Sequence, residues 1–161
     1  MPAHYVKPFA VLLPILCAAA AIGQAPTPYG ASITLDNAKK VATAAIAEAR
    51  KNTWNMAVAI VDPDGTLVYY EKMDNTQLGS AKVAVNKARS AALFKRPTKV
   101  FQDRLTSGNA GLPVLGIEGA VPLEGGIPLV MDGHIVGAIG VSGDSSDHDG
   151  ICAQAGVETL K

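Results

Sequence analysis

The sequence predicts an α+β fold in which one antiparallel sheet is covered by helices. Apolar runs at 127–131 and 134–141 are joined only by Asp132-Gly133. A two-residue Asp-Gly connection is the strongest short-range hairpin signal, because both turn residues need a positive φ. An earlier apolar run, 54–61, is followed by a Pro-Asp-Gly turn and a second short run at 66–71. The predicted strands come in hairpin pairs and do not alternate one by one with helices. This order argues against a parallel sheet.

The first 23 residues are typical of a signal peptide. Lys7 is the only Lys, Arg, Asp or Glu among them, and the apolar run that follows ends in Ala21-Ile22-Gly23, a small-x-small cleavage site. Cleavage there makes Gln24 the first residue of the mature chain. The alternative is a single membrane anchor, but the run is short for a span and is interrupted by Pro14. We therefore expect a periplasmic or secreted protein with no membrane association after cleavage.

Residues 24–33 contain two prolines and a glycine and predict a short tether before one domain, 34–161. Removing the leader also removes Cys17, so Cys152 is left alone and no internal disulfide can form. The net charge changes from 0 to −1, because Lys7 is lost. A nearly neutral chain gives no support for binding to nucleic acid or to an anionic membrane.

Helical spacing predicts the first helix up to about Lys51. Thr34 is a suitable N-cap, and Asp36 lies in the first turn, where the helix dipole favours an acid. The apolar positions that repeat at this spacing are Leu35, Ala38, Val41, Ala42, Ala45, Ile46 and Ala49.

A second helix is predicted over 77–95, with alanines gathered on one face. Arg96-Pro97 ends it, because the residue before a proline avoids the helical region. A short third helix is expected at 98–106 and a further strand at 112–117. Ser145 or Ser146 can cap a final helix that runs to Leu160.

Glycines surround the second hairpin at six positions: 119, 125, 126, 137, 140 and 143. Glycine inside a strand costs stability, so its repeated use indicates that something approaches closely. Three neighbours suit this pattern: the alanine face of the 77–95 helix, another subunit, or a flat ligand.

Three blocks of the chain resemble the GlcG/HbpS family, which includes the C-terminal domain of PduO-type proteins. They are N-T-W-N-M-A-V-A-I-V-D-P-D-G at 52–65, K-A-R-S-A-A-L-F-K-R-P-T at 87–98, and E-G-G-I-P-L-V-M-D-G-H-I-V-G-A-I-G-V-S-G at 124–143. The resemblance implies a profilin-like α/β/α sandwich with a five-stranded antiparallel sheet, assembled into homo-oligomers. It also implies non-covalent haem binding, in some members with haem sensing or breakdown.

The resemblance implies a ligand site on the second helix. In haem-binding relatives a hydroxyl residue lies near the iron, and the matching position here is Ser90. A neutral hydroxyl is a weak iron ligand, so such binding would be loose. Asn86 lies one turn before Ser90, and we expect both on one polar stripe with Lys82.

Cations near that helix suit haem propionates or a carboxylate substrate, arginine especially, because it pairs with carboxylates through two hydrogen bonds. They are Lys87, Arg89, Lys95 and Arg96. The alternative is an ordinary solvated helix face.

His148 lies among three aspartates and is the second candidate for contact with a metal or haem iron. The spacing fits no calcium loop, and acids at a helix start are expected from the dipole alone. Covalent c-type haem attachment is excluded, because no C-x-x-C-H is present. Cys152 is expected to be a buried structural cysteine.

The sequence therefore predicts an exported haem- or tetrapyrrole-binding protein that forms homo-oligomers, for binding, storage, sensing or breakdown. One alternative is an enzyme or accessory protein that acts on a small carboxylate or hydroxy acid through Glu124, Lys87 or Arg89. A second alternative is a structural oligomerisation domain. No catalytic residue can be assigned.

Overall fold

The computed structural model describes residues 1–2 and 27–161. The predicted signal peptide, apart from Met1 and Pro2, and the first residues of the tether lie outside the described residues. The rest of the tether runs beside the sheet, where Tyr29 forms a parallel bridge with Ile135. Within the described parts of the chain, no helix is both long and apolar enough to span a membrane.

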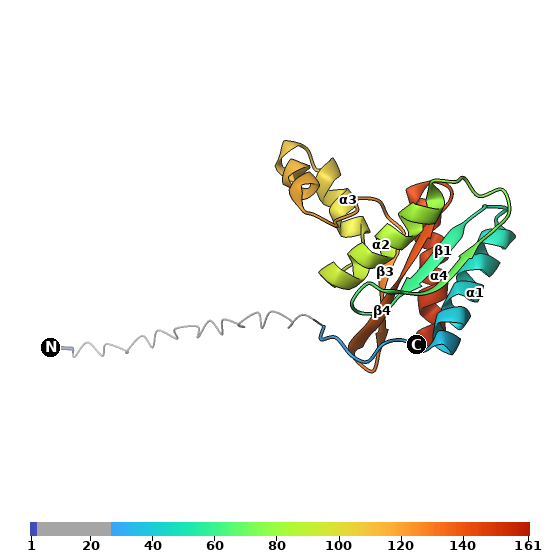
Figure 1. Cartoon of the computed structure of the whole chain (residues 1–161). Coiled ribbons are helices and arrows are strands. Elements are labelled where there is room, and N and C mark those ends of the chain that lie inside the picture. The colour runs from blue at the N-terminus through green and yellow to red at the C-terminus, as the bar shows by residue number, and fades with distance from the viewer. Residues whose placement is uncertain (3–26) are drawn as a thin grey trace.

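The described chain folds into a four-stranded antiparallel sheet between helices (Figure 1). The strand order is β2-β1-β4-β3. The elements follow one another as α1 Leu35–Lys51, β1 Ala57–Val61, β2 Leu67–Lys72, α2 Ser80–Phe94, α3 Lys99–Thr106, the 3-10 helix η1 Asn109–Gly116, β3 Gly126–Met131, β4 His134–Ser142, α4 Ser146–Val157 and the 3-10 helix η2 Glu158–Leu160. The predicted α+β class is confirmed.

The predicted fifth strand is wrong, because residues 109–116 form η1 instead. Pro113 lies inside η1 and has no backbone N–H to give to a strand partner. Gly111 packs directly on the backbone of α3, at Arg104 and Leu105. The apolar run at 112–117 therefore folds back on α3 and adds no strand to the sheet.

Both predicted hairpins are confirmed. Asp132 and Gly133 have φ of 49° and 75°, the two positive values that a two-residue turn of this kind requires. The turn between β1 and β2 is closed by Asp62, whose carboxylate accepts from the N–H of Asp64 and of Thr66. The predicted cap of α1 is also confirmed, since the Thr34 hydroxyl accepts from the N–H of Asn37 at 3.3 Å.

The two faces of the sheet are covered differently. Helices α1 and α4 pack together over one face, and α2 crosses the other (Figure 1). The α1–α4 side holds a core with large aliphatic side chains, among them Val41, Ile46, Met56, Ile60, Leu129 and Ile139. The α2 side is built almost entirely of alanines: Ala57, Ala59, Ala84, Ala88, Ala91, Ala92 and Ala138, with Val61.

Helix α2, with its alanine face, is the close neighbour of two strand glycines, Gly126 and Gly140. A Cβ at Gly140 of β4 would overlap the carbonyl oxygen of Ala84 and crowd the backbone nitrogen of Ala88. A Cβ at Gly126 of β3 would overlap the carbonyl oxygen of Lys87. Of the three neighbours that the sequence allowed, the helix is the one that these two glycines contact.

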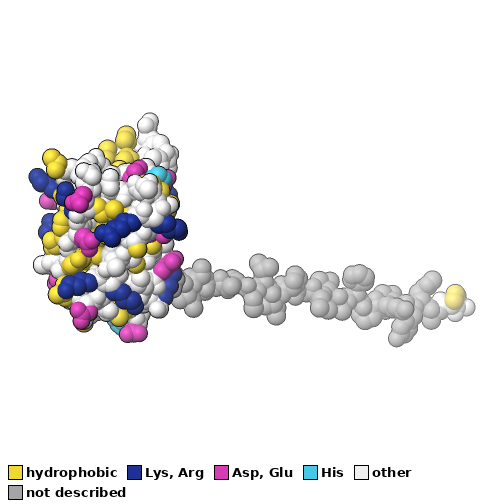
Figure 2. All heavy atoms as spheres, turned by 90° about the vertical axis from the view of Figure 1, so that its right-hand side faces the viewer, with side chains coloured by type: hydrophobic (Ala, Val, Ile, Leu, Met, Phe, Trp, Pro, Cys, Tyr) yellow, Lys and Arg dark blue, Asp and Glu magenta, His cyan; other side chains and the backbone are white. Residues whose placement is uncertain are grey.

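Charged side chains of both signs are interspersed on the face shown in Figure 2, which looks onto the right-hand side of Figure 1. No large area of a single sign stands out on this face.

Candidate functional site

The most unusual feature of the structure is a buried ion pair at one end of the sheet. Lys87 of α2 is only 1% exposed and Asp149 of α4 only 2%. The Lys87 ammonium donates to Asp149 Oδ2 at 2.6 Å and to the carbonyl oxygen of Val141 at 3.1 Å. Taking both charges out of water costs several kcal/mol per ion, so the pair persists only with good geometry. The alternative of a solvated helix face is wrong for Lys87.

Burial sets the proton affinities of this pair. Loss of solvation raises the pKa of Asp149, and the attraction of Lys87 opposes that rise. Loss of solvation likewise lowers the pKa of Lys87, against the attraction of Asp149. Burial and pairing therefore act in opposite directions on the pKa of each group.

Two glycines at the start of β3 make room for the pair. Gly125 has a φ of +120°, and a Cβ there would lie 2.8 Å from Asp149 Cβ and 3.1 Å from Lys87 Nζ. Gly126 is held on α3 by its N–H, which donates to Thr98 Oγ1 at 2.9 Å. The glycine-rich stretch therefore brings β3 against α2 and against Lys87 itself.

Two hollows lie beside the ion pair. The larger one, the Glu124 cleft, has a volume of about 570 Å³. Its walls include Pro97, Lys99, Glu124, Gly125, Ile127 and Ile151, with further carboxylates at Glu48 and Glu158. The smaller one, the Ser80 pocket, has a volume of about 230 Å³ and is lined by Lys87 and Asp149 together with Gln77, Gly79, Ser80, Val83, Leu123, Ser142, Asp144 and Ser146.

Ser90 is fully buried, and its hydroxyl accepts from the N–H of Val121 at 3.0 Å. Asn86 is exposed on the same helix, so the predicted common polar stripe is wrong. Because four residues make slightly more than one turn of an α-helix, Ser90 lies further round α2 than Asn86 does. At that position the segment 117–123 covers it, through the contact with Val121.

The two arginines of the predicted site contact different parts of the fold. Arg89 Nε donates to the carbonyl oxygen of Gly65, in the turn of the first hairpin, at 3.0 Å. Arg96 Nε donates to the carbonyl oxygen of Phe94, and its guanidinium lies 5.8 Å from the centre of the Phe101 ring. Lys87 and Ser90 thus point inward, whereas Asn86, Arg89 and Arg96 are exposed and Lys95 and His148 are half-buried. The structure does not bring them together around one cavity.

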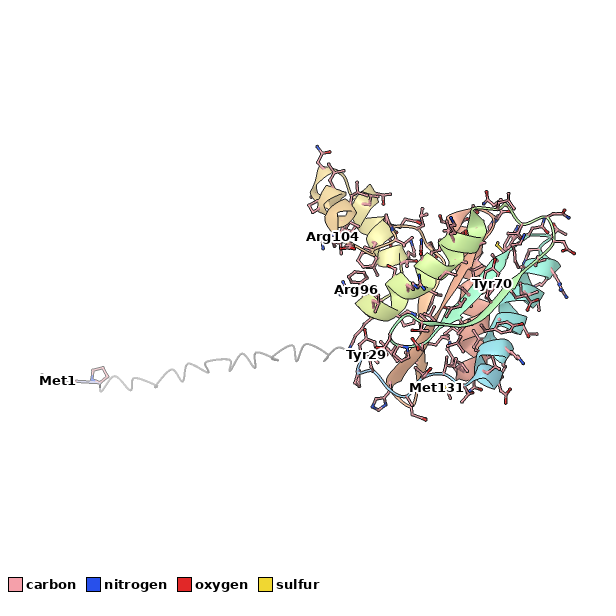
Figure 3. The ribbon with its side chains drawn as sticks, viewed as in Figure 1. Met1, Tyr29, Tyr70, Arg96, Arg104 and Met131 are labelled. Atoms are coloured by element: carbon pink, nitrogen blue, oxygen red, sulfur yellow. The ribbon has the colours of Figure 1, made fainter. Side chains whose placement is uncertain are left out.

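Helices α3 and η1 form an arm, residues 99–116, that projects from the rest of the fold (Figure 1). Large apolar side chains are exposed on the arm and directly after it in the chain: Val100, Leu112, Leu115 and Ile117. Arg104 lies on the arm and Arg96 at its base (Figure 3). The arm therefore combines exposed apolar surface with guanidinium groups.

His134 and His148 contact protein groups that need no ligand. The His148 ring stacks on Trp54 at 3.8 Å between ring centres, and its Nδ1 lies 3.2 Å from Asp144 Oδ1. His134 is exposed, with Nδ1 2.9 Å from the carbonyl oxygen of Asp132. In the described parts of the chain, no three His, Cys, Asp or Glu side chains are grouped to hold a metal ion.

Cys152 is buried, as predicted. Burial raises the pKa of its thiol to about 12, with smaller contributions from nearby carboxylates. A thiol that stays protonated is a poor nucleophile.

The sequence reasoning missed the pairing of Lys87 with Asp149. The signal was present in part, because Lys87 shares the helical spacing of Ala84, Ala88 and Ala91 and so belongs to the sheet-facing side of α2. Asp149 lies 62 residues further along the chain, and no local pattern identifies it as the partner.

Comparison with known proteins gives consistent matches. The profile of the family described as "Haem degrading protein HbpS-like" matches residues 33–158. The chain is 38% identical over 95 residues to Protein GlcG of Escherichia coli strain K12, and that match covers 59% of this chain and 69% of GlcG. It is 28% identical over 134 residues to the corrinoid adenosyltransferase PduO of Salmonella typhimurium, and that match covers 80% of this chain and 39% of PduO.

Solved structures match over most of the described chain. HbpS superposes with a TM-score of 0.74 at 32% identity, covering 82% of this chain and 92% of HbpS. A PduOC:heme complex superposes with a TM-score of 0.72 at 28% identity, covering 81% of this chain and 96% of PduOC.

Proposed function

This chain belongs to the HbpS-like family, and from that premise we propose that it is an exported protein that binds haem non-covalently. The family match, over residues 33–158, carries the proposal. The family's description as haem-degrading and the haem complex of the PduOC relative both support haem binding. The resemblance seen in the sequence is thereby confirmed as membership of the family.

The arm supplies the surface that suits haem best. A porphyrin needs apolar contact for its faces and cations for its two propionates. The exposed side chains of Val100, Leu112 and Leu115 offer the first. Arg96 and Arg104 offer the second, because guanidinium pairs with carboxylates through two hydrogen bonds. Bound haem would supply a redox-active iron at this surface.

The Glu124 cleft suits haem less well, although its volume is that of a typical ligand pocket. Three carboxylates, Glu48, Glu124 and Glu158, line it against the single cation Lys99. Propionates would be repelled there, so electrostatics favours the arm over the cleft.

Ser90 does not reach this surface in the structure. Its hydroxyl is buried and already accepts from Val121, so an iron contact by Ser90 requires the segment 117–123 to move away. Its role as a weak iron contact, like that of His148, stays a prediction. Lys87 is buried against Asp149, and Asn86 and Arg89 are exposed on α2 away from the arm's own residues, so their part in haem binding stays a prediction.

A haem on the arm would have one face toward solvent. A second copy of the chain could cover that face, and we therefore propose a homo-oligomer. A stable oligomer that binds no ligand would instead favour a structural oligomerisation domain.

Titration of the mature chain, from Gln24, with hemin tests haem binding directly. We expect saturable growth and shift of the Soret band in the parent protein. Ser90→Ala is expected to keep that response, because the hydroxyl is buried. A changed Soret maximum in this variant would support an iron contact, and no Soret response in the parent would overturn the proposal.

Export is tested separately by expressing the whole chain in a bacterium with two membranes and separating the periplasm. The expected product lacks residues 1–23, and mass spectrometry of the intact protein would show Gln24 as its first residue. An uncleaved cytoplasmic protein would contradict export and leave haem binding unaffected.

A further inference from the structure

The Glu124 cleft, whose charge makes it unsuitable for haem, suits a ligand of the opposite charge. Its volume of about 570 Å³ lies within the range of pockets that hold small organic molecules. Residues at the entry to β3 and residues of α4 form most of the wall, and Pro97 and Lys99 add a part from the start of α3. The cleft is therefore large enough to enclose a ligand with a hydrocarbon body.

One stripe of α4 gives the cleft a long and partly apolar wall. Its residues recur at the spacing of one helical face and extend over about 10 Å: Ile151, Gln154, Ala155 and Glu158. Ile151 is 47% exposed although its side chain is large and apolar. Pro97 and Ile127 add further apolar surface. A ligand that covered these side chains would gain stability from the apolar area removed from water.

Glu124 has acceptor capacity to spare. Its side chain is 23% exposed and lies against α4, where a Cβ at Gly150 would overlap its Oε1. Within residues 27–161, no hydrogen bond to this carboxylate is formed, since the Lys99 ammonium is 3.7 Å away and donates instead to Asp103 at 2.7 Å. A carboxylate has about four acceptor sites, so Glu124 favours a ligand that brings N–H donors.

The charge of the cleft favours a cation. Three carboxylates of its lining stand against one ammonium: Glu48, Glu124 and Glu158 against Lys99. The ion-pair partners that lie outside the lining, Lys51 and Asp103, carry opposite charges and leave this balance unchanged. Helix α4 ends beside Glu158 with no basic residue in its last turn, so the negative end of its dipole adds to the attraction for a cation.

We propose that the Glu124 cleft binds a small organic cation, a primary ammonium on an apolar body. The ammonium donates to the Glu124 carboxylate, and the apolar body covers Ile151 and Ile127. This site goes beyond the haem proposal, because neither Arg96 nor Arg104 lines it and its ligand has the charge opposite to that of a propionate.

Calorimetric titration of the mature protein with phenethylamine tests the proposal. We expect saturable binding of this amine. Hydrocinnamate has the same body with a carboxylate in place of the ammonium, and it should bind at least about tenfold more weakly because the lining repels it. Methylammonium, which carries the charge without the body, should also bind at least about tenfold more weakly.

Glu124→Gln tests the proposed charge partner with little change in side-chain size. It should weaken phenethylamine binding about tenfold, the usual effect of losing a hydrogen bond to a charged group. Glu118→Gln, at an exposed acid outside the cleft, is the matched control and should leave the affinity unchanged.

A second variant keeps the test sound if Glu124→Gln disturbs the fold. Ile151→Ser changes a half-exposed side chain and should weaken phenethylamine binding about threefold through lost apolar contact. Failure of phenethylamine to bind a folded parent, or equal binding of hydrocinnamate, would overturn the proposal. Equal affinity in Glu124→Gln and Glu118→Gln would also overturn it. Hemin titration of the same samples reports on the haem proposal independently, because none of the substituted residues lies on the arm.

Discussion

The two faces of the single sheet are built on different principles. The α1–α4 face buries bulky aliphatic side chains such as Ile60, Leu129 and Ile139, and burial of each contributes about 1.5–3 kcal/mol. The α2 face buries alanines and brings the backbone of α2 into contact with glycines of the sheet. Apart from Val61, its other buried side chains are polar: Ser80, Lys87, Ser90 and Thr98.

This difference places most of the buried polar side chains on the α2 side of the sheet. Large apolar side chains hold the α1–α4 face together, and the one buried charge that this side contributes is Asp149 of α4. The close approach of α2 instead places an ammonium and hydroxyls beside β3 and β4. Neither proposed binding site, the arm or the Glu124 cleft, includes a buried side chain of the α1–α4 core, so the comparison predicts which substitutions affect folding and which affect ligands.

The largest expected effect comes from breaking the buried pair on the α2 side. Lys87→Met leaves the Asp149 carboxylate buried without its partner, and such a loss costs about 3–5 kcal/mol. Urea unfolding followed by circular dichroism measures it. The double replacement, with Asp149→Leu, should recover most of that loss. A single variant as stable as the parent would show that the pair is not needed for folding.

Two substitutions that each change one methyl group, one on each face of the sheet, compare the two faces directly. Gly140→Ala adds a methyl that meets the backbone of α2, and overpacking of this kind costs roughly 3 kcal/mol. Ile139→Val, at the next residue but on the other face, removes one methyl and should cost about 0.5–1.5 kcal/mol.

Unfolding midpoints in urea compare the two. Gly116→Ala is the control, since a Cβ there meets nothing within 4 Å. If Gly140→Ala proved milder than Ile139→Val, the close approach of α2 would not be rigid.

Cys152, in the α1–α4 core, should show a pH effect of known sign. Burial raises the pKa of its thiol from 9.0 to about 12. The unfolded chain therefore loses this proton at a lower pH than the folded chain, and stability falls as the pH rises through that window. The parent should lose stability relative to Cys152→Ala between about pH 9 and 12.

Thiol reagents test the same residue under milder conditions. At about pH 8 the native protein should react far more slowly than the urea-unfolded chain, because reactivity requires the thiolate. Equal rates would contradict the burial of Cys152.

The smallest expected effect on stability is on the arm. Leu115 is 65% exposed, so Leu115→Ser should change the free energy of unfolding by no more than about 0.5 kcal/mol. Hemin affinity should nevertheless fall. Leu35→Ser, at a leucine of α1 that is 49% exposed, is the matched control and should leave hemin affinity unchanged. Equal hemin affinity in both variants would remove the arm from the haem proposal.

Local patterns predicted most of the fold. Thr34 capped the first helix, Asp132 and Gly133 joined β3 to β4, helical spacing located α1 and α2, and a serine at a possible cap located α4. These features depend on neighbours within a few residues, which the sequence displays directly. The run at 112–117 misled the prediction, because its apolar residues outweighed Pro113 and the glycines on either side of it.

The site was less predictable, because its parts are far apart in the chain. The glycines at 125 and 126 indicated a close neighbour, but not that Lys87 would be part of it. Ser90 and Asn86 looked equivalent by spacing, and only the position of the segment 117–123 distinguishes them. Asp149 was noticed as one acid among several near His148, whereas its role depends on a contact across the end of the sheet.

Hemin titration of two matched double variants tests most directly whether the arm on the α2 side is the haem surface. Arg96→Ala with Arg104→Ala removes two cations from the arm. Lys39→Ala with Lys40→Ala removes two exposed cations from α1. We predict that the arginine variant binds hemin at least about tenfold more weakly than the parent, as expected for loss of charge-assisted hydrogen bonds, and that the lysine variant binds as the parent does. Equal weakening in both variants, or none in either, would contradict the account.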